Sequence, residues 1–147
     1  MMWIVNVGTL ALRGDRHPDD WARVGEDQPN TPVVTVVRAL IHDGNQIRYM
    51  SGRMEQCRHA TVMWLRRFVT DGVLPAHLWM RANGDMRPDD VVKRELYEEH
   101  VRGLLDVEGV IARDLRRWHV ELGLTVFQCN PSTRTASSGH AERTCVH

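Results

Sequence analysis

Short apolar segments alternate with amphipathic ones along most of this chain, and this alternation limits its fold more than any other feature. Five segments have the length and composition of buried β-strands. They are residues 3–7, 46–50, 78–80, 107–112 and 124–128. Strands that alternate with helices predict an α/β fold in three layers, a mostly parallel five-stranded sheet with helices on both faces.

Helical segments are expected between these strands. One begins at Thr31-Pro32 and stops at Gly44, a start and a stop that are typical of helices. Another begins at Pro88, where Asp89-Asp90 suits the positive end of a helix dipole. The other two are expected near residues 56–69 and 115–122.

Length and composition indicate one soluble domain. The chain has 147 residues, a net charge of zero and 42% hydrophobic residues. It has no run of about 20 apolar residues, and its first residues do not resemble a signal peptide. We therefore expect a cytoplasmic protein with no membrane partner. We expect residues 1–128 to form the domain and residues 129–147, which are polar and show no periodicity, to be a disordered tail.

Polar residues follow the second predicted strand and lie near the start of the third predicted helix. Ligands bind parallel α/β sheets at the carboxyl ends of the strands. Ser51-Gly52-Arg53 follows the second strand and suits an anion, although the motif by itself favours an ordinary turn with a capping serine. Lys93 lies one turn into the third helix, where it could reach a phosphate or remain a solvated surface lysine.

Four parts of the chain carry a resemblance to a known family. The string Val7-Gly8-Thr9-Leu10 resembles the end of the first motif of haloacid-dehalogenase (HAD)-type phosphatases, Asp-x-Asp-Gly-Thr-Leu. Within these phosphatases, one family is similar to this chain at residues 8–16, 51–53, 84–98 and 122–128 taken together. Over residues 3–128 the chain resembles the 3′-phosphatase domain of bacteriophage-type polynucleotide kinase.

The resemblance implies an HAD-like, Rossmann-like fold and a phosphate site. In that family a phosphate leaves the 3′ end of a polynucleotide through a covalent aspartyl-phosphate, with magnesium bound. The family's phosphate-binding serine and lysine correspond to Ser51 and Lys93. The expected phosphate-binding set is Gly8, Thr9, Ser51, Gly52 and Lys93.

Arginine supplies almost all of the positive charge and suits bidentate phosphate recognition, although the base composition of a genome also enriches it. Six arginines are candidate nucleic-acid contacts, and scattered surface charge explains them as well. They are Arg13, Arg16, Arg53, Arg58, Arg81 and Arg87.

The sequence departs from the family where the chemistry is done. The nucleophilic aspartate corresponds to Val5 and the acid–base aspartate to Val7. Valine can neither attack phosphorus nor transfer a proton. Strand alternation is expected to turn the intervening Asn6 toward the opposite face. The acidic motif after the fourth strand is also degenerate, so we expect no metal and no cofactor, although the family uses magnesium.

These substitutions favour a non-catalytic protein. Phosphate monoester hydrolysis needs up to ~10²¹-fold acceleration, and loss of a covalent nucleophile alone costs about 10⁶-fold in a hydrolase. We therefore expect an inactive or impaired relative that still binds phosphate or phosphorylated nucleic-acid ends, independently of magnesium.

Other readings stay open at this point. One is an active phosphatase that recruits Asp15, Asp85 or Asp114. Another is a phage-type interaction factor with a protein partner or as a homo-oligomer, and a decaying gene is a further alternative. A zinc site in the tail is disfavoured, because its spacing fits no common zinc module. Its ligands would be Cys129, His140, Cys145 and His147.

Overall fold

The computed structural model describes residues 1–12, 21–113, 115 and 117–129. Its strands are β1 (Met2–Asn6), β2 (Ala11–Leu12), β3 (Gln28–Pro29), β4 (Gln46–Met54), β5 (Leu78–Arg81), β6 (Gly109–Ala112) and β7 (Val126–Gln128). Its α-helices are α1 (Thr31–His42), α2 (Arg58–Phe68), α3 (Asp89–His100) and α4 (Arg117–Leu122). Short 3₁₀ helices span Val7–Thr9, Trp21–Glu26 and Glu55–Cys57.

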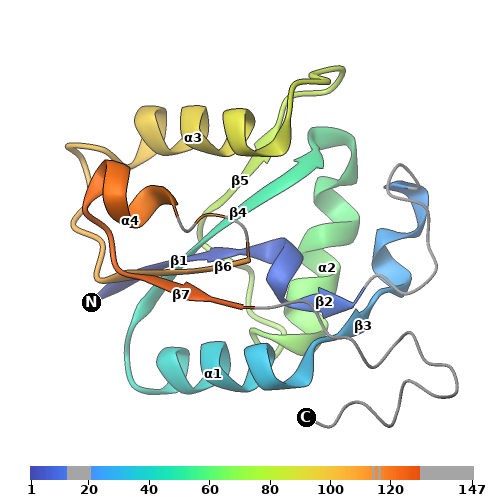
Figure 1. Ribbon diagram of the computed structural model, residues 1–147. Coiled ribbons are helices and arrows are strands. Elements are labelled where there is room, and N and C mark those ends of the chain that lie inside the picture. The colour runs from blue at the N-terminus through green and yellow to red at the C-terminus, as the bar shows by residue number, and fades with distance from the viewer. Residues whose placement is uncertain (13–20, 114, 116, 130–147) are drawn as a thin grey trace, which may run out of the picture.

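The main sheet has five strands in the order β5-β4-β1-β6-β7, and every pair is parallel. Helices α1 and α2 cover one face, while α3 and α4 cover the other (Figure 1). The predicted three-layer α/β architecture is therefore confirmed. Each of the five strands that pattern predicted is present, because buried parallel strands are continuous apolar runs.

The core is divided by the sheet into two apolar clusters. Val5, Val37 and Leu65 belong to the cluster beneath α1 and α2, together with Tyr49. Ile4, Met50, Tyr97 and Trp118 belong to the cluster beneath α3 and α4. Successive residues of one strand therefore serve opposite clusters, as the period of a β-strand requires.

Helix boundaries follow local chemistry. Helix α1 has Pro32 in its first turn, buries Val34 and Val37, and is followed by Gly44 at a φ of 89°. A positive φ suits glycine, which has no Cβ, so the chain turns there toward β4. Helix α3 follows Pro88 and carries Asp89 and Asp90 in its first turn.

Two features of the fold were not predicted. Strands β2 and β3 form a small antiparallel pair, in which Ala11 faces Pro29. Strand β4 does not end at Met50 but continues to Met54, with a shift of register between Ser51 and Met54 against β5. Both features bring residues to the carboxyl edge of the main sheet. Within the described residues, no helix is both long and apolar enough to cross a membrane.

The apolar clusters set the expected cost of core truncation. Leu65 is fully buried on α2, whereas Leu104 is 70% exposed after α3. We expect Leu65→Ala to lower the free energy of unfolding by about 2–5 kcal/mol, because it leaves a cavity in the core. We expect Leu104→Ala to change it by less than about 0.5 kcal/mol. Urea denaturation measures both, and equal costs would contradict this placement of the core.

Candidate phosphate site

A polar cavity of about 170 Å³ lies at the carboxyl ends of β1 and β4. Strand order reverses at β1, between β4 on one side and β6 on the other, which is where α/β sheets bind ligands. Among the described residues, four cationic side chains and two carboxylates line the cavity, so this set carries a positive formal charge. The lining residues are Asn6, Gly8, Ala11, Asp27, Ser51, Gly52, Arg53, Arg81, Asp89, Lys93 and Arg113.

Ser51 lies in the irregular part of β4, not in a turn after it, which corrects the expectation from sequence. The Arg53 N–H donates to Ser51 Oγ at 3.0 Å. Within the described residues, the Ser51 hydroxyl donates to no acceptor. Its hydrogen is therefore available to an anion in the cavity.

Lys93 is the only lysine in the chain, and its side chain is only 8% exposed. It forms an ion pair with Asp89, one helical turn earlier on the same face of α3. A Cβ added to Gly52 would lie 1.7 Å from Asp89 Oδ1, so glycine is required where β4 passes α3. Ser51 and Lys93, which the resemblance paired, therefore line one cavity.

Arg81 ties the end of β4 to the start of α3. Its Nε donates to Gly52 O at 2.7 Å, and its Nη2 donates to Asp89 Oδ1 at 3.1 Å. Its Nη1 donates to Asp85 O at 2.9 Å and to Arg87 O at 2.6 Å. Because the guanidinium is engaged on all three nitrogens, Arg81 holds the walls of the cavity in place.

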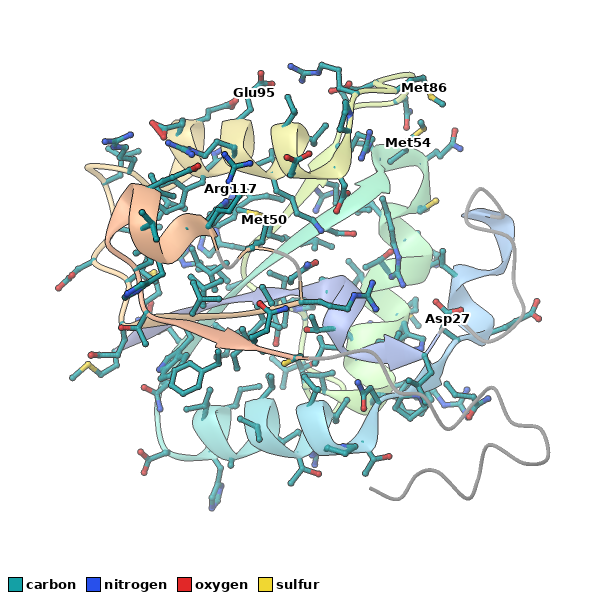
Figure 2. All side chains as sticks on the ribbon, in the orientation of Figure 1. Asp27, Met50, Met54, Met86, Glu95 and Arg117 are labelled. Atoms are coloured by element: carbon teal, nitrogen blue, oxygen red, sulfur yellow. The ribbon has the colours of Figure 1, made fainter. Side chains whose placement is uncertain are left out.

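Arg53 forms a buried ion pair with Asp27. Arg53 Nη2 lies 3.2 Å from Asp27 Oδ2, and the two side chains are 8% and 3% exposed. Arg53 Nη1 also donates to Thr61 Oγ1 on α2, and Trp64 Nε1 donates to Asp27 O at 2.8 Å. Figure 2 shows Asp27 beside α2. The ion pair therefore joins α2 and the segment before β3 to the end of β4.

Val5 and Val7 are fully buried within the cluster beneath α1 and α2, and neither lines the cavity. Asn6 does line the cavity, together with Asp89 and Lys93 of α3. Alternation holds along β1, since Val5 and Val7 pack beneath α1 and α2 and Ile4 packs beneath α3 and α4. The expectation was wrong about which side of β1 borders the cavity. The polar group at this strand end is thus a neutral amide.

Gly8 and Thr9 differ in their relation to the cavity. Gly8 lines it, and its N–H donates to Asn6 Oδ1 at 3.2 Å. Thr9 is buried and is not among the lining residues. Its hydroxyl donates to Asn6 O at 2.7 Å, so Thr9 stabilises the turn that follows β1.

Only some of the candidate arginines line the cavity. Arg53 and Arg81 line the cavity, whereas Arg58 and Arg87 do not. Arg58 pairs with Glu55 and donates to Leu78 O, and Arg87 pairs with Asp85 and Glu95. Hydrogen bonds from Arg87 lower the pKa of Asp85 to about 2. Arg13 and Arg16 lie outside the described residues.

Sequence reasoning did not identify four of the polar lining residues as site residues, namely Asn6, Asp27, Asp89 and Arg113. The i,i+4 spacing of Asp89 and Lys93 on a helix was a signal for one of them. The sequence carried no comparable signal for Asp27, which lies directly before β3. Of the alternative acids, Asp85 does not line the cavity. Asp15, Asp114 and the tail residues His140, Cys145 and His147 lie outside the described residues.

The described residues around this cavity do not fit a magnesium site. Magnesium prefers carboxylate and water oxygens in octahedral geometry. The two carboxylates that line the cavity, Asp27 and Asp89, are both engaged by cationic side chains. Val5 and Val7 place hydrocarbon within the core where the family has carboxylates. The donor set suits an anion better than a divalent cation.

The buried ion pair yields a matched test. Asp27→Asn removes the carboxylate that pairs with the buried Arg53 guanidinium, so we expect a loss of about 3–5 kcal/mol in unfolding free energy. Asp71 pairs with Arg38 at the surface, where the side chains are 73% and 42% exposed. Asp71→Asn should therefore cost less than about 1 kcal/mol. Urea denaturation of both variants measures the difference, and similar losses would argue against a structural role for the buried pair.

Comparison with known proteins agrees with this geometry. The family model of the polynucleotide kinase PNKP phosphatase domain matches residues 2–133. A predicted bifunctional polynucleotide kinase/RNA ligase of Autographa californica nuclear polyhedrosis virus is 32% identical over 106 residues. That match covers 70% of this chain and 15% of the viral protein.

Solved structures give the same result. A chain of the Pnkp1/Rnl/Hen1 complex superposes with a TM-score of 0.79 at 30% identity, over 89% of this chain and 46% of that one. The class C acid phosphatase of Bacillus anthracis with tungstate bound has a TM-score of 0.52 at 13% identity, over 87% of this chain and 66% of that one, and shows the fold alone. This chain thus spans less than half the length of the viral protein and of the matched chain of the Pnkp1/Rnl/Hen1 complex. It belongs to the family of polynucleotide kinase phosphatase domains and has their HAD-like fold.

Proposed function

We propose that this domain binds the phosphate at a polynucleotide end, without magnesium, and does not hydrolyse it through an aspartyl-phosphate. The observation that carries the proposal is the composition of the cavity. Ser51 and Lys93 line it together with an excess of cationic side chains, while Val5 and Val7 are withdrawn into the core. Family membership supports a phosphorylated polynucleotide as the ligand.

Electrostatics support binding without a metal. Two like charges ~4 Å apart repel by roughly 4 kcal/mol at an effective dielectric of 20. In a site with two free carboxylates, a divalent cation offsets that repulsion. Here a neutral amide stands at the end of β1, and the nearby carboxylates are paired with arginine and lysine. An incoming phosphate therefore meets a positive cavity.

Lys93 provides the most direct binding test. Calorimetric titration with a 3′-phosphorylated oligonucleotide should show binding both in magnesium and in EDTA, and the same oligonucleotide with a 3′-hydroxyl should bind more weakly. Lys93→Met should weaken phosphate binding about ten- to a hundredfold, because it removes a charged hydrogen bond. The control is Arg94→Met, since Arg94 pairs with Glu98 and Glu121 outside the cavity. Binding that vanishes in EDTA would contradict metal independence.

Asn6 provides a test in which a negative charge is added to the cavity. Asn6→Asp keeps an acceptor for the Gly8 N–H but adds a negative charge at the cavity. We expect phosphate affinity in EDTA to fall at least tenfold, since the new carboxylate repels the ligand. The same titration measures the change. An unchanged affinity would mean that phosphate binds elsewhere.

Hydrolysis is the third test. We expect no turnover of p-nitrophenyl phosphate or of a 3′-phosphorylated oligonucleotide above background in magnesium, since no nucleophile corresponds to the family's aspartate. Release of inorganic phosphate measures it. Turnover above background would support an active phosphatase with other acids and overturn the proposal, and its loss in Asp89→Asn would identify Asp89 as one of those acids.

A further inference from the structure

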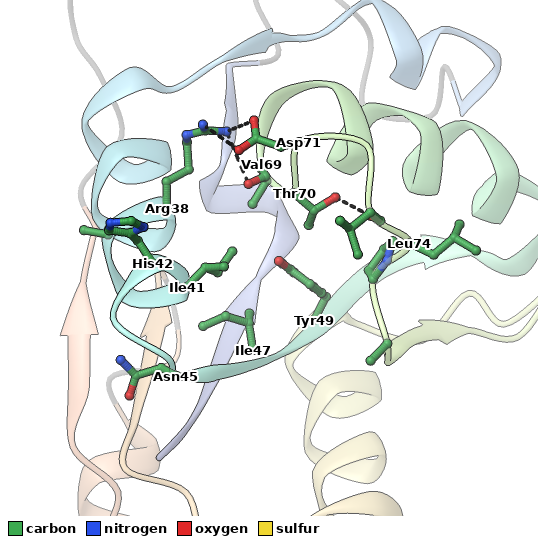
Figure 3. Close-up of a pocket in the computed structure, with 14 residues that line it drawn as sticks. Arg38, Ile41, His42, Asn45, Ile47, Tyr49, Val69, Thr70, Asp71 and Leu74 are labelled. Carbon is green, nitrogen blue, oxygen red and sulfur yellow. Dashed lines mark hydrogen bonds and ion pairs between the residues drawn. The ribbon is translucent and has the colours of Figure 1, made fainter.

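A second cavity, of about 510 Å³, lies between α1, β4 and the segment that follows α2 (Figure 3). It shares no lining residue with the phosphate cavity. Its floor is formed by Ile47 and Tyr49 of β4, and its walls include Ile41, Val69 and Leu74. Its volume lies in the range of small-molecule sites, which are hollows with mainly apolar walls and few polar groups.

Tyr49 brings a polar group into this apolar hollow. The residue is only 2% exposed, and within the described residues its hydroxyl has no hydrogen-bond partner. Figure 3 shows its oxygen directed into the space between Ile41 and Thr70. Burial raises the pKa of Tyr49 to about 12, so the hydroxyl is neutral and can donate as well as accept. Buried hydroxyls are normally paired, and this one faces the cavity instead.

The charged groups at the mouth of the cavity are already engaged. Arg38 forms two hydrogen bonds with the Asp71 carboxylate, at 2.9 and 3.0 Å, and also donates to Val69 O. The Thr70 hydroxyl bonds to backbone oxygens of Leu65 and Val73. A charged ligand would therefore lose its hydration without gaining a free counter-charge.

We propose that this cavity binds an uncharged, mainly apolar small molecule that forms one hydrogen bond with Tyr49 Oη. The apolar walls favour a hydrocarbon body, and the Tyr49 hydroxyl favours one donor or acceptor on it. A nucleobase fits less well, because it would leave several polar groups unpaired against apolar walls. The inference is independent of phosphate binding at the other cavity.

The test uses two probes of the same shape. Indole carries an N–H that Tyr49 Oη can accept, whereas indene has the same rings without a polar group. Each probe is titrated into the full chain labelled with ¹⁵N, and amide shifts are recorded. Both probes should shift residues around the cavity, with indole binding more tightly. If neither probe shifts residues 38–49 or 69–76, the proposal is overturned.

Tyr49→Phe isolates the hydrogen bond. This variant should weaken indole binding about five- to tenfold and leave indene binding unchanged. The matched control is Tyr97→Phe, which removes the chain's only other tyrosine hydroxyl from beneath α3. The control should leave both affinities unchanged. An unchanged ratio of indole to indene affinity in Tyr49→Phe would contradict the assigned bond.

Thermal unfolding supplies an independent readout. Because the Tyr49 hydroxyl has no partner among the described residues, Tyr49→Phe should leave the melting temperature unchanged or raise it. A fall of several degrees would show that the hydroxyl is satisfied within the fold. In that case the cavity would offer no free polar group, and the proposal would be overturned.

Discussion

The guanidinium of Arg81 joins three segments that are separate in the sequence: the irregular end of β4, the loop before α3 and the first turn of α3. It does so through Gly52 O, the carbonyls of Asp85 and Arg87, and the Asp89 carboxylate. Asp89 in turn pairs with Lys93. The position of Lys93 relative to Ser51 depends on this connection, and so does the shape of the phosphate cavity.

The proposed binding site and the family's catalytic carboxylates belong to different parts of this fold. The proposed site draws on Ser51, Lys93 and arginine side chains of β4, β5 and the segment after β6. Catalysis in the family depends on carboxylates at the end of β1. Here Val5 and Val7 pack in the core, so a carboxylate restored at either position would be buried among apolar side chains. Asn6 is the residue of β1 that lines the cavity.

Much of the fold could be predicted from the sequence, because apolar runs and helix boundaries are local signals. The continuation of β4 past Ser51 could not, since Ser-Gly is typical of a turn and only pairing with β5 keeps it extended. Ser51 and Lys93 were singled out by their positions in the chain, and the resemblance gave them a phosphate-binding role. Asn6 was not expected in the site because alternation shows which residues share a face but not which face borders the cavity. Asp27 was missed because it lies in a short connection before β3. The unpartnered hydroxyl of Tyr49 depends on tertiary packing that no local pattern encodes.

The central claim is that phosphate is held non-covalently between Ser51 and Lys93 without a metal ion. A crystal structure of the protein with a 3′-phosphorylated dinucleotide, grown in EDTA, tests it directly. We expect the phosphate within hydrogen-bond distance of Ser51 Oγ and Lys93 Nζ, with its ester bond intact. A phosphoryl group attached to a carboxylate, or a phosphate bound away from these two residues, would contradict the account.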